Sequence, residues 1–301
     1  MTTYDPGPIN DRQESPQAKQ YLRAMSRLYT LAKHTQQIRQ VGVLVIAIVS
    51  VALGLTLADA RAAVGALGTV VGFAFAIVTA SIQRRWRSTA AAAQEEFDTD
   101  VYQLPWKDSL VDHPSPTDVA QAASRYKGNR FDTPWYPNTG PVARPLDILI
   151  CQRSNLGWGV ASHRAFANWL TGLAILLIVI AALIGVFVHE SWTDWLLVVL
   201  PLLAPIADAF EQRQQHAESA ETKTRADAKI TALWSKGLGD HTAVTIGDCR
   251  DTQDLILNSR RSNADIPDGF DNRRRDKYEM TMTEAANQLI AQAIEHGRTT
   301  Q

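Results

Sequence analysis

The chain has 301 residues, of which 46% are hydrophobic and 20% are charged, and its formal net charge is −1. These averages would fit a two-domain soluble protein. The clustering of the apolar residues argues against one, because they are concentrated in four runs at residues 41–57, 62–82, 169–188 and 192–210.

Each run has roughly the 17 to 25 residues that an α-helix needs to cross a bilayer core about 30 Å thick. The sequence therefore predicts an all-α polytopic membrane protein with two transmembrane hairpins and a helical cytoplasmic layer. The alternative is a set of buried helices in a large soluble core. Forty residues precede the first run, and the second follows it at once, so we expect no cleaved signal peptide.

The basic residues predict the orientation. Six Lys or Arg residues precede the first run, ten lie between the hairpins and thirteen follow the fourth run, whereas the two hairpin turns hold only Arg61. By the positive-inside rule, both termini and the central connector face the cytoplasm. Cys151 and Cys249 then lie in a reducing compartment, where we expect no structural disulfide.

Turn and helix signals divide the chain into six parts. Residues 1–14 are predicted to be disordered, and 15–40 to form an amphipathic cytoplasmic helix that lies on headgroups or packs on its neighbours. The first hairpin occupies 41–82. Its second helix carries small residues at four-residue spacing, which allow close helix packing either within the hairpin or between protomers. This ridge consists of Gly68, Gly72, Ala76 and Ala80.

Residues 83–166 form the cytoplasmic connector. Its first part has high helix propensity, so the second membrane helix is expected to continue to about Gln103 before Pro105 stops it. "SPTD" at 115–118 predicts a helix start with Ser115 as N-cap. The stretch from Phe131 to Trp158 combines four prolines with aromatic residues that disordered linkers avoid, which indicates an ordered bridge between the hairpins.

The second hairpin occupies 167–210 and holds two features of a possible gate. Asp208 lies near the end of the fourth run, where a carboxylate faces a cavity or a partner, or else reaches the interface and meets Arg213. Pro205 can kink the helix. Asp194 lies fourteen residues before Asp208, about 21 Å along a helix, which excludes a shared-proton aspartyl pair.

The cytoplasmic helical tail occupies 211–301. A helix is expected to extend from the fourth run to Gly237, and another to run from about Val244 to Ser259. "IPDG" at 266–269 predicts a turn. Thr281 and Glu284 then predict a capping box for a last helix that ends at Gly297.

No enzymatic chemistry is visible. The histidines and cysteines lack metal-site spacing, and there is no phosphate-binding glycine loop or nucleophile elbow. We therefore expect no enzyme, no cofactor and no bound metal.

Four motifs around the two hairpins, "FDTDVYQLPW", "FDTPWYP", "CQRSNLGW" and "DTQDLILNSRRSNADIPDGFDNRRRDKYEM", resemble the SMODS-associated four-transmembrane effector family. The resemblance covers most of residues 15–290. It implies a pore-forming effector of bacterial anti-phage defence in the inner membrane. A partner nucleotidyltransferase makes a cyclic oligonucleotide, and the effector responds by permeabilising the membrane.

Two hypotheses follow. In the first, a homo-oligomeric pore opens or assembles when cytoplasmic helices bind the cyclic oligonucleotide. In the second, the chain is a non-conducting membrane scaffold that recruits a cytoplasmic partner. For the first, phosphates require Arg and bases require aromatic faces, although Trp135 and Tyr136 could instead grip a neighbouring helix. The candidate ligand-binding residues are Arg130, Trp135, Tyr136, Arg153, Arg260, Arg261, Arg273, Arg274 and Arg275.

Overall fold

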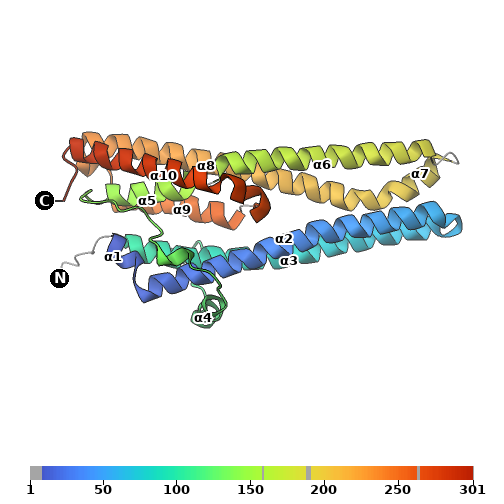
Figure 1. Ribbon diagram of the computed structural model, residues 1–301, viewed down its shortest axis with the longest axis horizontal. Helices are drawn as coiled ribbons and strands as arrows, with labels where there is room; N and C mark the ends of the chain where they lie inside the picture. Colours follow the sequence, from blue (N-terminus) through green and yellow to red (C-terminus); the bar gives the residue numbers. More distant parts are fainter. Residues whose placement is uncertain (1–8, 158, 188–190, 263–264, 301) are drawn as a thin grey trace.

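The computed structural model describes residues 9–157, 159–187, 191–262 and 265–300, with side chains for all of these except 157, 187 and 268–279. The described chain is helical and contains no β-strand, only one isolated bridge between Val142 and Thr299. Figure 1 shows an elongated molecule in which the long helices run along its length. The all-α prediction is confirmed.

The first hairpin consists of α2 (Pro16–Thr56), the short helix η1 (Ala58–Ala60) and α3 (Arg61–Tyr102). Ser15 caps α2 by accepting from the backbone N–H of Ala18, and Pro16 fills the first helical position. Gln103 ends α3 in the left-handed conformation, at φ 56°. The second membrane helix therefore does continue to Gln103, without a break.

The second hairpin consists of α6 (Val160–Phe187), α7 (Trp192–Val199), η3 (Leu200–Leu202) and α8 (Leu203–Gly239). The fourth span is interrupted at η3, where Pro201 lies. Pro205 lies in the first turn of α8, and the interruption lies one turn before it. A proline disturbs a helix at this place, because it has no N–H for the carbonyl oxygen four residues earlier.

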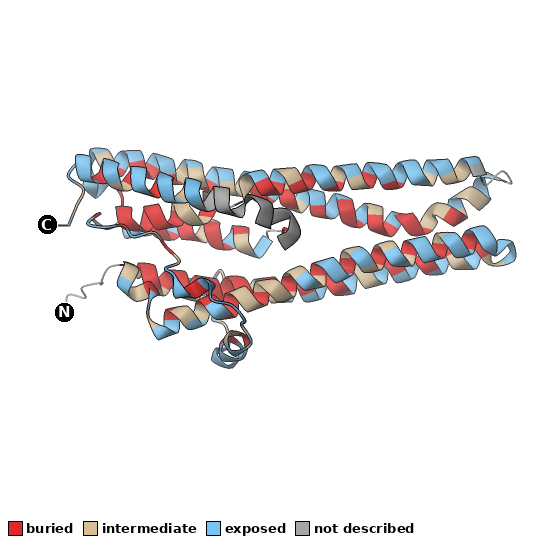
Figure 2. Ribbon diagram, viewed as in Figure 1, coloured by how far each residue is buried: buried red, intermediate tan, exposed pale blue. Residues whose placement is uncertain are grey.

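Four helical segments are long and apolar enough to cross a membrane. Large apolar side chains on them point away from the rest of the protein and are half exposed or more, among them Val45, Val70, Ile77 and Leu183. Figure 2 shows exposed residues along the outer faces of the long helices, up to the end of the molecule that carries the two hairpin turns. Exposed apolar surface on this scale requires lipid, so the protein is a multi-pass membrane protein.

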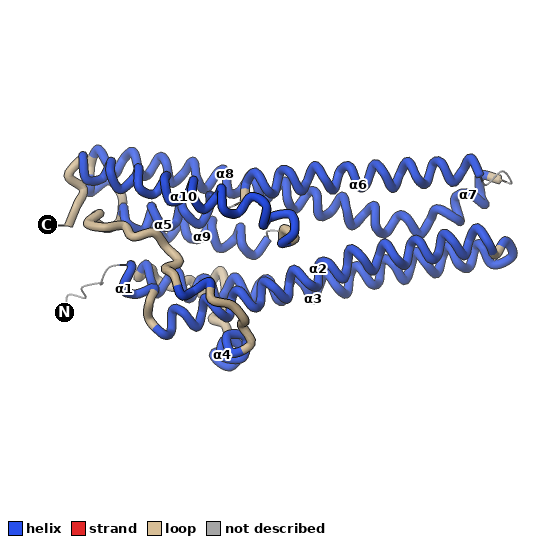
Figure 3. The backbone as a smooth tube through the Cα atoms, viewed as in Figure 1, coloured by secondary structure: helices blue, strands red, loops and turns tan. Residues whose placement is uncertain are grey.

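The remaining helices pack at the opposite end, around the extensions of α3 and α8. We call this part the polar layer; Figure 3 shows that most of the loops lie in it. Its buried core includes Phe97, Tyr102, Ile148, Leu149 and Trp234. Its separate helices are α1 (Ile9–Gln13), α4 (Pro116–Ser124), η2 (Arg130–Asp132), α5 (Leu146–Gly157), η4 (His241–Ala243), α9 (Ile246–Ser262) and α10 (Asp268–Glu295).

Two predictions about the polar layer are wrong. Ile9–Gln13 form the helix α1, and Ile9 and Gln13 are buried, whereas residues 1–14 were expected to be disordered; residues 1–8 lie outside the described part. The last helix begins at Asp268, with Pro267 as its N-cap residue, and not near Thr281. A proline before the first helical residue suits a helix start as well as a turn, which explains this error.

Candidate ligand cavity and the buried ion networks

The proline-rich bridge is docked on the polar layer by Tyr136. The ring of Tyr136 lies 5.6 Å from that of Phe97 and 5.1 Å from that of Tyr102, centroid to centroid. The backbone N–H of Tyr136 donates to Oε1 of Gln13 over 2.7 Å. The side-chain amide of Gln13 donates to the backbone carbonyl oxygen of Tyr136 over 3.3 Å. The bridge, as far as residue 157, is thus an ordered part of the layer, and Trp158 lies outside the described residues.

A cavity of about 600 Å³ opens beside this bridge, bounded also by residues of α3, α5, α8, α9 and α10. We call it the ligand cavity. Its size lies within the range of about 300–1,000 Å³ of small-molecule sites. Its described lining includes three cations and no carboxylate, together with side chains that can form hydrogen bonds. The cations are Arg130, Lys223 and Arg260, and the polar side chains include Gln94, Ser154, Asn155 and Asn287.

Four of the predicted ligand-binding residues meet at this cavity, namely Arg130, Trp135, Tyr136 and Arg260. The guanidinium carbon of Arg130 lies 4.8 Å from the centre of the Trp135 ring, a cation–π contact. Arg130, Trp135 and Tyr136 therefore lie at the same cavity as Arg260, although a long stretch of sequence separates them from it.

The other predicted residues lie elsewhere. Arg153 lines an adjoining cavity of about 290 Å³ and pairs with Asp227 at 3.1 Å. Arg261 donates to the carbonyl oxygen of Leu110 over 2.6 Å, away from the ligand cavity. Arg273, Arg274 and Arg275 lie in α10, where the side chains are outside the described part.

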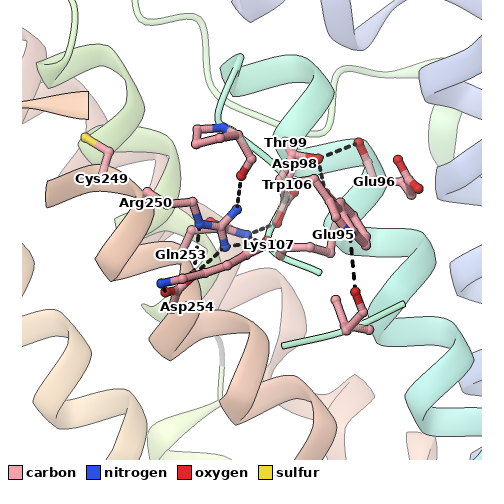
Figure 4. Close-up of polar contacts among 12 residues, drawn as sticks. Glu95, Glu96, Asp98, Thr99, Trp106, Lys107, Cys249, Arg250, Gln253 and Asp254 are labelled. Atoms are coloured by element: carbon pink, nitrogen blue, oxygen red, sulfur yellow. Dashed lines mark hydrogen bonds and ion pairs between the residues drawn. The ribbon is translucent and has the colours of Figure 1, made fainter. Parts of the chain in front are cut away.

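A buried network of charged and amide groups joins α3 to α9, and Figure 4 shows the part of it around Glu95, Arg250 and Gln253. We call it the carboxylate network; it consists of Glu95, Asp98, Arg250, Gln253 and Arg260. Arg250 Nη2 lies 2.6 Å from Glu95 Oε1, and Arg260 Nη1 lies 2.6 Å from Asp98 Oδ2. Gln253 donates to both carboxylates over 2.8 Å. The side chains of Glu95 and Asp98 are 2% and 0% exposed.

Sequence reasoning missed most of this network. It selected Arg260 only as a possible phosphate ligand. The available signal was the spacing of Glu95 and Asp98, which puts both carboxylates on one face of the predicted helical extension. Their partners lie about 155 residues later, and only the tertiary fold brings them together.

Two groups at the cavity wall, the Arg260 guanidinium and the Tyr136 hydroxyl, both have a raised pKa and stay protonated. Burial by itself lowers the pKa of Arg260, but the neighbouring Asp98 carboxylate outweighs this effect and raises the pKa, so the guanidinium stays positive. Burial and the charge of Asp98 raise the pKa of Tyr136. Its hydroxyl therefore remains a donor to Asp98 Oδ1, over 2.5 Å.

A second network lies where α2 and α8 meet the bilayer. Arg39 Nε and Asp208 Oδ1 are 3.1 Å apart, and their side chains are only 4% and 7% exposed. Gln212 donates to Asp208 Oδ2 over 2.5 Å, and Gln40 donates to Gln212 over 2.6 Å. The partner of Asp208 is therefore Arg39 of the first hairpin and not Arg213, which the sequence left as an alternative.

The ridge of small residues packs against the same chain. A Cβ atom on Gly68 would lie 2.6 Å from Ser50 Cβ, and one on Gly72 would lie 3.0 Å from Ala204 Cβ. Ala76 and Ala80 line a cavity of about 120 Å³ beside the Arg39–Asp208 pair. The ridge thus brings α3 close to both α2 and the start of α8.

Among the described residues, no group of three His, Cys, Asp or Glu side chains could hold a metal ion. The Nδ1 atoms of His163 and His216, two buried residues on α6 and α8, lie 2.9 Å apart. This pair links the two helices of the second hairpin on the side of the polar layer.

Comparisons with known proteins agree with this architecture. The model of the SMODS-associating 4TM effector domain matches residues 7–289. A probable CBASS effector molecule of Bacillus cereus (strain VD146) is 24% identical over 259 residues, which cover 82% of this chain and 86% of that protein. No solved structure matches. Because the family match spans nearly the whole sequence, the chain belongs to the SMODS-associating 4TM effector domain family.

Proposed function

We propose that this protein is a non-enzymatic effector of bacterial anti-phage defence that binds a cyclic oligonucleotide in the ligand cavity and then permeabilises the inner membrane as a homo-oligomer. The observation that carries the proposal is the cavity, which combines three cations with an aromatic ring and has no carboxylate in its described lining. It belongs to a layer whose helices continue directly into the membrane spans.

The chemistry of the cavity suits a nucleotide. Arginine binds phosphate oxygens through a planar fork of N–H donors, and aromatic side chains stack on bases. Arg130 and Arg260 supply the guanidinium groups, and Trp135 supplies the ring. The neighbouring amides of Asn155 and Asn287 can form hydrogen bonds with base edges.

Two continuous helices connect the cavity to the bilayer. Gln94 lies on α3 and Lys223 lies on α8, and both residues line the cavity. α3 also contributes the second membrane span, and α8 contributes the end of the fourth span after the interruption at η3. A ligand that changes how these two helices are held therefore acts directly on the transmembrane part.

The proposed orientation follows the distribution of basic residues, which puts the polar layer and both termini in the cytoplasm. A soluble nucleotide made in the cell by a partner nucleotidyltransferase would reach the cavity there. The relative in Bacillus cereus bears the name of a probable CBASS effector, which supports the same role here.

The gate is proposed to lie at Asp208 and Pro205. The buried Arg39–Asp208 pair joins the two hairpins where they enter the bilayer, and Pro205 opens α8 directly after the interruption at η3. Separation of the pair would expose two charges to the small cavity beside the ridge. Such charges favour entry of water and ions.

Dye-loaded liposomes test the proposal. Purified protein reconstituted in them should cause leakage when cyclic di- and trinucleotides are added, and Lys223→Ala should reduce the response at least tenfold in ligand concentration. Lys229→Ala, on the same helix but outside the cavity lining, is the matched control and should respond normally. Binding of a ligand without leakage would favour the scaffold alternative, and the absence of both binding and leakage across the panel would contradict the proposed function.

A further inference from the structure

Arg260 lies between the ligand cavity and the carboxylate network. It lines the cavity, and its side chain is 10% exposed. Its Nη1 atom binds Asp98, whereas its Nη2 atom is buried and has no hydrogen-bond partner among the described residues. A buried guanidinium with an unused donor is costly, and an incoming anion would satisfy it.

Arg250, the other arginine of the network, has hydrogen-bond partners for its whole guanidinium group, in contrast to Arg260. Its Nη2 binds Glu95 at 2.6 Å and Asp254 at 2.8 Å, its Nε binds Asp254 at 2.9 Å, and its Nη1 donates to the Pro105 carbonyl over 3.2 Å. All three nitrogens are engaged, and Arg250 does not line the cavity. Of the two arginines, only Arg260 combines spare binding capacity with a place at the cavity wall.

Asp98 is an incomplete partner for Arg260. It takes only one of the two terminal nitrogens, whereas a phosphate can bind both as a fork. The Asp98 carboxylate would keep other donors after such an exchange, because Tyr136 donates to Oδ1 and Gln253 donates to Oδ2. Exchange of the anion on Arg260 therefore leaves Asp98 hydrogen-bonded.

The position of Asp98 on α3 gives this exchange a consequence in the membrane. Asp98 lies sixteen residues, or about 24 Å, beyond the predicted end of the second span at Ile82, on the same unbroken helix. Its bond to Arg260 ties that helix to α9. Loss of the bond removes one of the links between this extension and α9, while Arg250 and Gln253 of α9 keep their bonds to Glu95 and Asp98.

We propose that Asp98 is a built-in competitor for the ligand: a phosphate group of the ligand displaces the Asp98 carboxylate from Arg260 and thereby weakens the link between α3 and α9. This inference rests on the proposed function and adds to it the residue that the ligand replaces. It predicts that Asp98 weakens binding in the wild type, the opposite of what a purely structural residue does.

The test measures binding to the detergent-solubilised full chain by isothermal titration calorimetry, with inorganic pyrophosphate and the cyclic nucleotide panel as probes. Asp98→Asn should bind pyrophosphate at least tenfold more tightly than wild type, and Arg260→Lys should bind at least tenfold more weakly. Asp100→Asn, the same substitution two residues further along α3, is outside the cavity lining and should bind like wild type.

Unchanged or weaker pyrophosphate binding by folded Asp98→Asn would overturn the inference, as would a complete absence of binding in both proteins. If Asp98→Asn does not fold, hydrogen exchange in the wild type decides: pyrophosphate should speed exchange in residues 95–102, and slowed or unchanged exchange would overturn the inference. A different result would contradict the proposed function and not this inference: pyrophosphate binds, but no cyclic nucleotide of the panel does.

Discussion

At the scale of single residues, the two neighbouring aromatic residues of the bridge have different surroundings. Tyr136 is 3% exposed and packs on Phe97 and Tyr102, so it anchors the bridge on a helix. Trp135 is only partly buried, lies under Arg130 and lines the cavity. The sequence left open whether these residues hold a base or a helix, and the structure shows the helix contact for Tyr136, while both residues line the cavity.

The Arg39–Asp208 pair gives a prediction about stability. Asp208→Asn leaves the Arg39 charge buried without its partner, which costs roughly 3–5 kcal/mol. Arg39→Gln in the same chain removes that charge and should recover much of the loss. Thermal unfolding in detergent of both single variants and the double variant measures the coupling. Equal and additive losses would show that the pair has no role in joining the hairpins.

The thiol of Cys249 gives a prediction about pH. Burial raises its pKa to about 12, so at pH 8 only about one thiol in ten thousand is ionised. Its alkylation by iodoacetamide should be very slow at pH 8 and should speed up about tenfold for each pH unit up to pH 11. Protein denatured in detergent is the control and should react at once. Rapid alkylation of the native protein at pH 8 would contradict the burial of this thiol.

At the scale of elements, the close packing of α3 depends on glycine. Gly68 faces Ser50 on one side and lies near Pro201 of η3 on the other, so the ridge passes between two helical segments of its own chain. The interruption of the fourth span lies beside it. The close packing of α3 on α2 and the interruption of the fourth span therefore lie next to each other.

Gly68→Ala should destabilise the protein by about 1–3 kcal/mol, because the added methyl carbon would lie 2.6 Å from the Ser50 Cβ atom and force α2 and α3 apart. Gly172→Ala on α6 is the matched control. Its Cβ would meet nothing within 4 Å, and alanine is the better helix former, so this change should be neutral or stabilising. Equal melting temperatures for the two variants would mean that the ridge does not form the tight contact described.

Local sequence signals predicted most helices but not where the helices bend or meet. Ser15, Ser115 and Gln103 lie at helix ends that capping and propensity identify. The start of α10 was missed, since a proline can begin a turn, begin a helix or break one, and only the packing decides. The carboxylate network was missed for a related reason: hydrogen bonds between residues 95 and 250 leave no local pattern.

At the scale of the whole molecule, two membrane hairpins share one polar layer. Residues from the bridge, α3, α5, α8, α9 and α10 all line the ligand cavity, so each hairpin has at least one helix at the same site. In addition, Arg61 at the start of α3 and Asp194 in the first turn of α7 lie 3.2 Å apart at the other end. The hairpins are therefore joined at both ends of the molecule.

The membrane spans could be predicted from hydropathy because lipid leaves no alternative to apolar helices. The cavity could be predicted only in part: the sequence selected Arg130, Trp135, Tyr136 and Arg260 by their chemistry, and the fold brings these four together. It also selected Arg261, which is adjacent in sequence but points to Leu110, since residue type alone does not show which side of α9 faces the cavity.

The most direct test of the account is the current across a planar bilayer that holds the protein in one orientation. Cyclic oligonucleotide added on the side of the polar layer should open a conductance, and the same ligand added only on the side of the hairpin turns should not. The account predicts that Lys223→Ala shifts this response to higher ligand concentrations. Ligand that binds the protein but opens no current from either side, or current that is equal from both sides, would contradict a membrane pore controlled from the ligand cavity.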